Sequence, residues 1–182
     1  SIFAFVKHPI RPDHALQVFA FEDDYNFGIL QSSLHWLWFT EKGSTLKSDY
    51  RYTSNTVFNT FPFPQSPTIE HIRAVVDCSR AILAYRQTVQ EKSQTGISLR
   101  QIYKLLEMPG KNELRELHSA LDNAIISAYG FDPQGDMLAQ LLALNETIFN
   151  KEKAGESVLA PGIPPYYPNP QDLISEYAIS PK

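Results

Sequence analysis

The residues best suited to chemistry in this sequence lie between Lys42 and Pro64. Three cations, Lys42, Lys47 and Arg51, come before or at the start of a stretch rich in aromatic rings and small hydroxyl and amide side chains. Cations beside rings that can stack are typical of surfaces that contact nucleic acid. The same composition is also typical of an ordinary sheet edge. Both interpretations are open on these residues alone.

Segment 51–64 is predicted to be extended and half-buried. No helical spacing of apolar residues runs through it, and aromatic and β-branched residues favour strands. Pro62 and Pro64 end the segment, because proline has no N–H to donate to a sheet ladder. Since the side chains of a strand alternate between two faces, about half of those at 50–59 must face the core.

Two groups of motifs resemble MmeI-like DNA methyltransferases, which are large single-chain adenine methylases of restriction-modification type. The first group is Asp23-Asp24-Tyr25-Asn26-Phe27-Gly28-Ile29-Leu30-Gln31-Ser32, His35, Trp38, Arg51-Tyr52-Thr53 and Thr60-Phe61-Pro62-Phe63-Pro64. The second group comprises residues 113–122, Ala128-Tyr129-Gly130 and Leu141-Leu142-Ala143-Leu144-Asn145. These motifs keep the order of the family and cover most of the chain.

The resemblance implies that the chain is the C-terminal part of such an enzyme. It would hold the end of the target-recognition region, followed by a helical domain. The parent enzyme would transfer a methyl group from S-adenosylmethionine to adenine N6 in a specific duplex sequence, and an accompanying nuclease is an open question. The implied partners are duplex DNA and a catalytic domain upstream in the same chain. A start at Ser1 rather than at methionine agrees with a piece of a longer protein.

The chain is not predicted to hold a catalytic or cofactor site of its own. An adenine-N6 methylase needs a glycine-rich loop for the methyl donor and an (Asn or Asp)-Pro-Pro-(Tyr or Phe) motif for the flipped base. The eight glycines are not clustered, and Ile163-Pro164-Pro165-Tyr166 has isoleucine where the polar acceptor must stand. S-adenosylmethionine is therefore expected only in the parent enzyme.

Other kinds of site are weakly indicated. The five histidines never stand at a metal-ligand spacing with a cysteine or carboxylate, so no metal site is expected. The acidic run 22–24 fits a helix N-terminus or hairpin end better than a cation site. A helix-turn-helix over 99–129 would present Glu113, Glu116 and Asp122 beside its cations, a face that repels phosphate.

Composition limits the classes of protein further. A net charge of −4 argues against a free-standing DNA binder that depends on overall charge, so any DNA contact must come from a local patch. The single cysteine, Cys78, excludes an internal disulfide framework and favours the cytoplasm. No apolar run approaches the ~18 residues of a membrane span, so no membrane partner is expected.

The predicted fold class is α+β, with a small strand-rich N-terminal portion that contains one helix. Residues 2–6 and 16–21 are expected to pair as a hairpin, and the apolar spacing over 27–39 predicts a helix that Gly43 ends. This portion, 1–65, is the predicted distal part of the recognition region. The boundary falls at Gln65-Ser66-Pro67, where Ser66 can cap a helix that begins at Pro67.

Residues 66–155 are predicted to form an antiparallel helical bundle. Apolar stripes follow Ile69, Leu99, Leu114 and Leu138, Ser98 and Gln101 have the spacing of a capping box, and Gly130 and Gly155 end helices. Residues 156–182 are predicted to be a proline-rich, extended tail.

Two functions from different classes follow. In the first, the chain clamps and orients duplex DNA for the upstream domain, with phosphate contacts from Lys42, Lys47 and Arg51 and base or sugar contacts from Tyr50, Tyr52, Asn55 and Asn59. In the second, the chain only braces the methyltransferase and does not contact DNA. The cations at 42–51 favour the first, and the acidic balance favours the second.

Overall fold

The computed structural model describes residues 2–7, 9, 13, 16–46, 49–93 and 96–179, with backbone only at 44–46 and 49–51. The described chain is mostly helical and has two small two-stranded sheets, so the α+β prediction holds in its broad form. The α-helices are α1 (Asp24–Gln31), α2 (Ser33–Lys42), α3 (Ile69–Lys92), α4 (Leu99–Lys104), α5 (Glu113–Tyr129) and α6 (Met137–Lys153). The strands are β1 (Phe5–Val6), β2 (Ser44–Leu46), β3 (Asp49–Arg51) and β4 (Ala178–Ile179). A π-helical turn, η1 (Ser54–Phe58), and two 3₁₀ turns, η2 (Leu105–Glu107) and η3 (Pro170–Leu173), complete the elements.

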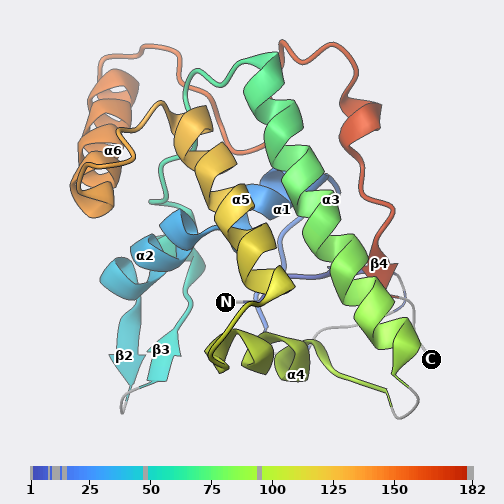
Figure 1. The fold of residues 1–182 in the computed structure, drawn as a ribbon. Coiled ribbons are helices and arrows are strands. Elements are labelled where there is room, and N and C mark those ends of the chain that lie inside the picture. The colour runs from blue at the N-terminus through green and yellow to red at the C-terminus, as the bar shows by residue number, and fades with distance from the viewer. Residues whose placement is uncertain are drawn as a thin grey trace.

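Helices α3 and α5 form the centre of the molecule, and α1 packs against both (Figure 1). The closest approach is at Gly28 of α1. A Cβ atom at this position would lie 2.4 Å from Ser79 Oγ, 2.7 Å from Val75 Cγ1 and 3.2 Å from Leu121 Cδ1. Glycine therefore lets α1 lie directly on α3 and α5, so the N-terminal elements have a fixed place on the helical part.

One hydrophobic core runs through both sides of the boundary that we predicted at residue 65. It includes, from the N-terminal side, Tyr25, Ile29, Trp38, Val57 and Phe61, and from the other side Ile72, Val76, Ile82, Leu114, Leu121, Ile125 and Leu141. Because these side chains share one cluster, the N-terminal elements and the helices that follow stabilise each other. The division into three domains stays a prediction.

Several helix ends lie where the sequence predicts them. Ser98 and Gln101 form the predicted capping box of α4, and Gly130, with φ of 67°, ends α5 in the left-handed conformation that glycine tolerates. Gly43 follows the last residue of α2, as predicted. Helix α3 begins two residues later than predicted, because Thr68 rather than Ser66 is its N-cap.

The predicted single helix over 27–39 is two helices, α1 and α2. Ser32 separates them, with its hydroxyl donating a hydrogen bond to the Ile29 carbonyl and accepting one from the His35 amide. These two bonds satisfy a helix C-terminus and a helix N-terminus at one residue. The chain can therefore turn at Ser32 while both helices keep an apolar face in the core.

The helices do not confirm the predicted antiparallel bundle. Helices α3 and α5 run antiparallel, but α6 stands at the opposite side of the molecule from α3 and contacts α2 (Figure 1). Helix α4 lies across the lower end of α5. Of the described helices, none is long and apolar enough to cross a membrane.

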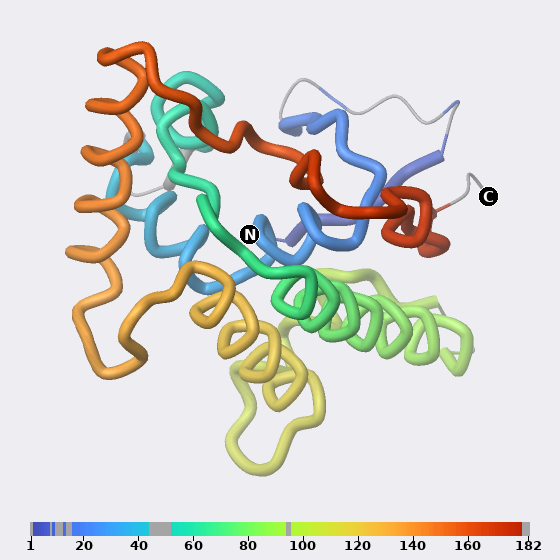
Figure 2. Tube along the Cα trace, turned by 90° about the horizontal axis from the view of Figure 1, so that it is seen from above, coloured from blue at the N-terminus to red at the C-terminus, as the bar shows by residue number. Residues whose placement is uncertain are grey.

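The strand pairing differs from the predicted hairpin of 2–6 with 16–21. Strand β1 pairs in parallel with β4, with Phe5 opposite Ala178 and Val6 opposite Ile179. The tail that supplies β4 leaves α6 and crosses back over the molecule to the N-terminal segment (Figure 2). It contains η3 and β4, so it is not the purely extended tail that we predicted. Residues 17–22 belong to no strand pair among the described residues.

The predicted extended segment 51–64 is also different. Strand β3 ends at Arg51, and residues 54–58 form the π-helical turn η1 before the chain becomes extended again at Phe61. The proline pairs do end the segment, and Pro62, Phe63 and Pro64 are buried under the helices. The aromatic pattern therefore reflects packing of a compact turn rather than the two faces of a strand.

Candidate nucleic-acid interface

The β2–β3 hairpin follows α2 directly and projects away from the helices (Figure 1). Its register places Ser44 opposite Arg51 and Thr45 opposite Tyr50. Lys47 lies outside the described residues, and only the backbone is described for Tyr50 and Arg51. Their contacts with DNA therefore stay predictions, although the hairpin carries two of them at one end of the molecule.

Lys42 stands in the last turn of α2, at the base of this hairpin. Its Nζ lies 5.2 Å from the centre of the Trp38 ring, and the side chain is half-buried. A cation here is stabilised by the ring and by the negative end of the helix dipole. A phosphate contact of Lys42 stays a prediction, and such a contact would compete with the interaction between its ammonium group and the Trp38 ring.

Two asparagines form an exposed amide pair on η1. Asn59 Nδ2 donates to Asn55 Oδ1 at 3.3 Å, and both side chains are exposed. The amide group of Asn55 and the carbonyl oxygen of Asn59 remain available on the outside. The pair therefore offers one donor and one acceptor side by side, the combination with which asparagine reads a base edge.

Thr60 and Trp38 hold the π-helical turn in place. Trp38 Nε1 donates to Thr60 Oγ1 at 3.2 Å, and the same hydroxyl donates to the Thr56 carbonyl at 2.7 Å. Since Trp38 is fully buried, the turn is attached to the core through a group that cannot move freely. The exposed amide pair therefore stands on a rigid support.

Residues 60–65, which follow η1, are held by hydrogen bonds from α5, α6 and the tail. Asn145 of α6 donates its side-chain amide to the Thr60 carbonyl at 2.7 Å, and Tyr129 of α5 donates its hydroxyl to the Pro62 carbonyl at 2.8 Å. The Gln65 side chain donates to the Leu159 carbonyl at 3.0 Å and accepts from the Leu159 amide at 2.9 Å. Three distant parts of the chain thus fix the position of 60–65.

Tyr52 is half-buried and packs against the core. Its hydroxyl lies 3.0 Å from Nε2 of His35, and its ring packs at 5.8 Å from that of Phe19 and 5.3 Å from that of Phe39. Burial raises the pKa of the Tyr52 hydroxyl and lowers that of His35 to about 4. Tyr52 and the neutral His35 therefore act as packing residues behind the hairpin.

The elements from β1 to η1 lie within a segment that matches a known protein family. Residues 3–65 match the family described as "MmeI, target recognition domain". The chain carries an MmeI-type target recognition domain. Lys42, the β2–β3 hairpin and the asparagine pair all belong to this domain, and the helices that support it lie outside the match.

Two known proteins are similar over more of the chain than the recognition domain. DNA methyltransferase A of Bacillus subtilis (strain 168) is 32% identical over 123 residues, which are 66% of this chain and 13% of that protein. The solved structure of the Type IIL restriction-modification enzyme MmeI in complex with DNA is 30% identical, with a TM-score of 0.60 over 70% of this chain and 16% of that one. The chain therefore spans less than a fifth of the length of either relative.

The acidic run before α1 anchors the recognition domain to α3. Asp23 is the N-cap of α1 and accepts hydrogen bonds from the backbone and side-chain amides of Asn26. Asp24 is fully buried and pairs with Arg80 of α3 at 2.7 Å. The run thus fits the predicted helix N-terminus, whereas the role of Arg80 had no signal in the sequence.

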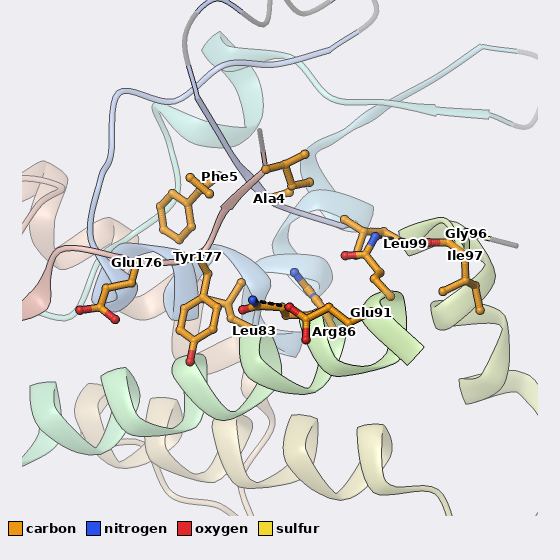
Figure 3. Close-up of a pocket in the computed structure, with 14 residues that line it drawn as sticks. Ala4, Phe5, Leu83, Arg86, Glu91, Gly96, Ile97, Leu99, Glu176 and Tyr177 are labelled. Atoms are coloured by element: carbon orange, nitrogen blue, oxygen red, sulfur yellow. Dashed lines mark hydrogen bonds between the residues drawn. The ribbon is translucent and has the colours of Figure 1, made fainter. Parts of the chain in front are cut away.

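A cavity of about 390 Å³ lies under the β1–β4 sheet, away from η1. In Figure 3 Leu83, Arg86 and Glu91 rise from α3, with Ala4 and Phe5 on the opposite wall and Gly96 and Ile97 closing one end. Among the described residues, no group of three histidine, cysteine, aspartate or glutamate side chains could hold a metal ion.

Arg86, in the floor of this cavity, is 3% exposed and was not singled out from the sequence. It donates to the Phe3 carbonyl and to Gln31 Oε1, each at 2.8 Å, and to the Tyr103 hydroxyl. A guanidinium can only donate, so the Tyr103 hydroxyl accepts from Arg86, and the same hydroxyl is hydrogen-bonded to Nε2 of His118 at 2.9 Å. This network joins the start of the recognition domain to α1, α3, α4 and α5.

Proposed function

We propose that this chain recognises and positions duplex DNA for an S-adenosylmethionine-dependent adenine-N6 methyltransferase of restriction-modification type. One observation carries the proposal: the recognition-domain match over 3–65 includes an exposed, rigidly supported amide pair beside a projecting hairpin whose strand β3 ends at Arg51. The similar enzyme MmeI is described in complex with DNA, which supports duplex DNA as the partner.

The proposed contacts divide into two kinds. Lys42, Lys47 and Arg51 would bind phosphates and so set the position of the duplex without reading its sequence. Asn55 and Asn59 would approach base edges, because their free donor and acceptor face outward from η1. Tyr50 would contact bases or sugars from the hairpin.

Methyl transfer itself is assigned to another part of a longer enzyme. The described residues do not fit a methyl donor site, because no glycine-rich loop follows a strand and Ile163 replaces the polar residue of the base-binding motif. The tyrosine of that segment, Tyr166, donates its hydroxyl to the Pro67 carbonyl and is thus part of the tail's packing. We derive no catalytic step from these residues.

The phosphate contacts can be tested by binding of mixed-sequence duplex DNA over a salt series. Charge reversal of Lys47 and Arg51 should lower the slope of log affinity against log salt by about 2, since each phosphate contact contributes roughly 0.9. A matched control reverses Lys151 and Lys153, which are exposed at the end of α6. An unchanged slope, or an equal change in the control, would contradict the assignment.

The base contacts need a readout of sequence preference. We expect Asn55→Ala and Asn59→Ala to relax the target preference of methylation by the longer enzyme, while affinity for mixed-sequence DNA changes little. A uniform loss of affinity for all sequences would place both residues on the phosphate backbone instead.

A second function, a brace without DNA contact, is favoured by the bonds that Asn145, Tyr129 and Gln65 make to 60–65. These bonds support a role of α5, α6 and the tail in holding the recognition domain in place. If the chain does not bind duplex DNA even at low salt, and methylation survives the Lys47 and Arg51 reversals, this second function replaces the first.

A further inference from the structure

Segment 16–21 of the recognition domain has no strand partner. In the part of the chain that the structure describes, the backbone N–H and C=O groups of 17–21 make no hydrogen bonds. The bonds on either side fix its ends: the Leu16 amide donates to the Asp13 carbonyl at 2.9 Å, and the Glu22 carbonyl accepts from the Ser175 amide at 2.8 Å. Most backbone groups in a folded protein are paired, so five consecutive free residues require an explanation.

From Val18 to Phe21 the side chains of this segment alternate between exposed and half-buried, as they do in a strand. Phe19 and Phe21 are half-buried and pack at 4.9 Å and 6.0 Å from the ring of Phe58. Leu16 and Val18 point the other way and are 64% and 66% exposed. The segment thus has the burial pattern of an edge strand over 18–21, with apolar residues on both faces.

The free edge lacks the features that normally prevent pairing. Exposed edge strands carry lysine, proline or a bulge that blocks another strand. Leu16-Gln17-Val18-Phe19-Ala20-Phe21 contains no charged residue and no proline. Such an edge would associate with other chains if it stayed open, so it is suited to permanent cover by a strand.

A groove beside the segment has room for side chains of that strand. It has a volume of about 250 Å³ and is lined by residues 17–21 together with Ser54 and Phe58. None of these lining residues is charged, which does not suit a DNA phosphate. An extended segment with apolar residues at alternate positions fits both the groove and the free backbone groups.

We propose that a strand from another part of the same enzyme pairs with 16–21 and places apolar side chains in this groove. The chain spans 13% and 16% of its two relatives, so most of such an enzyme is available to supply the strand. An intramolecular strand also meets the edge at a high effective concentration, whereas a second copy of the chain would have to associate. The proposal does not depend on DNA contact by Lys42 to Asn59.

Amide hydrogen exchange in the full-length enzyme without DNA tests this pairing. We expect the amides of 17–21 to exchange at least roughly tenfold more slowly than unstructured amides, as in a paired strand. The buried part of α3, Ile72–Leu83, reports in the same experiment that the enzyme is folded. Exchange of 17–21 at the unstructured rate beside a protected α3 would overturn the proposal, as would protection that rises with protein concentration, which indicates a second copy.

A matched pair of variants in the full-length enzyme gives a second test. Val18→Lys should lower the melting temperature and increase exchange of 17–21, because the lysine would lie in the covered edge. Met108→Lys changes a residue of similar exposure, 59%, between α4 and α5 and should have little effect. Equal behaviour of the two variants would overturn the proposal, whatever the DNA-binding experiments show.

Discussion

His35 should make the stability of this protein sensitive to mild acid. The ring is fully buried, with ring centres of Phe61 and Phe3 at 4.9 Å and 5.5 Å. Its Nε2 meets the Tyr52 hydroxyl, and its Nδ1 has no hydrogen-bond partner. Burial lowers the pKa of His35 from 6.5 to about 4, because the loss of hydration of an imidazolium there outweighs the opposing interaction with the Leu30 backbone.

The magnitude follows from the difference in proton binding. Between pH 6.5 and pH 4 the unfolded chain binds a proton at His35 and the folded chain does not, so stability is complete above pH 6.5 and is lost as the pH falls. The full effect is about 3 kcal/mol, at 1.36 kcal/mol per pKa unit. About 2 kcal/mol of it is already lost at pH 5.

Urea unfolding at pH 7, 6 and 5 measures this loss. His35→Phe combined with Tyr52→Phe removes the titrating ring and its partner together, which avoids leaving a buried hydroxyl unpaired. We expect the double variant to lose about 2 kcal/mol less than the wild type between pH 7 and pH 5. Tyr52→Phe alone is the control and should keep the wild-type dependence.

Other groups also titrate between pH 7 and pH 4, but they are the same in the wild type and in both variants. Burial lowers the pKa of His118 to about 4, which acts in the same direction, whereas burial raises the pKa of Asp23 and of Asp122, which acts in the opposite direction. The comparison between variants cancels them. If the wild type and the double variant lose equal stability, the ring of His35 is protonated in the folded state and the reasoning is refuted.

Three further substitutions test the packing that positions the recognition domain. Gly28→Ala should cost about 1–3 kcal/mol in urea unfolding, because the new methyl group would lie 2.4 Å from Ser79 Oγ on α3; no loss of stability would show that α1 can shift freely. Arg80→Met should cost about 2–3 kcal/mol by leaving the Asp24 carboxylate buried without its partner, and the double change with Asp24→Leu should recover much of this, a coupling that a double-mutant cycle measures. Asn145→Ala should lower the free energy of unfolding by about 1 kcal/mol and increase amide exchange at 60–62. Unchanged exchange at 60–62 would contradict this prediction.

The features that the sequence predicted well depend on neighbouring residues. The apolar stripe of α3, the capping box of Ser98 and Gln101 and the left-handed Gly130 each act within a few positions along the chain. Their physical cause is present in any short window of the sequence. Asn55 and Asn59 are exposed, which a contact with bases or sugars requires, and that contact stays a prediction.

The features that the sequence did not predict depend on distant partners. The π-helical turn η1 is held by Trp38 and Asn145, and the latter lies 85 positions from the carbonyl it binds. Strand β1 pairs with a strand more than 170 residues away instead of its neighbour. The hydrogen bond of Tyr52 to the buried His35 also had no signal in the sequence, and a DNA contact of Tyr52 stays a prediction.

The pairing of β1 with β4 sets the order in which this region can be completed during synthesis. Phe5 leaves the ribosome long before Ala178, its partner in the sheet. At the usual rate of 5–20 residues per second, β1 waits on the order of ten to thirty seconds. During that time the cavity over Arg86 lacks the wall formed by Tyr177 and Ile179. The sheet at the start of the recognition domain can therefore be completed only when the tail arrives.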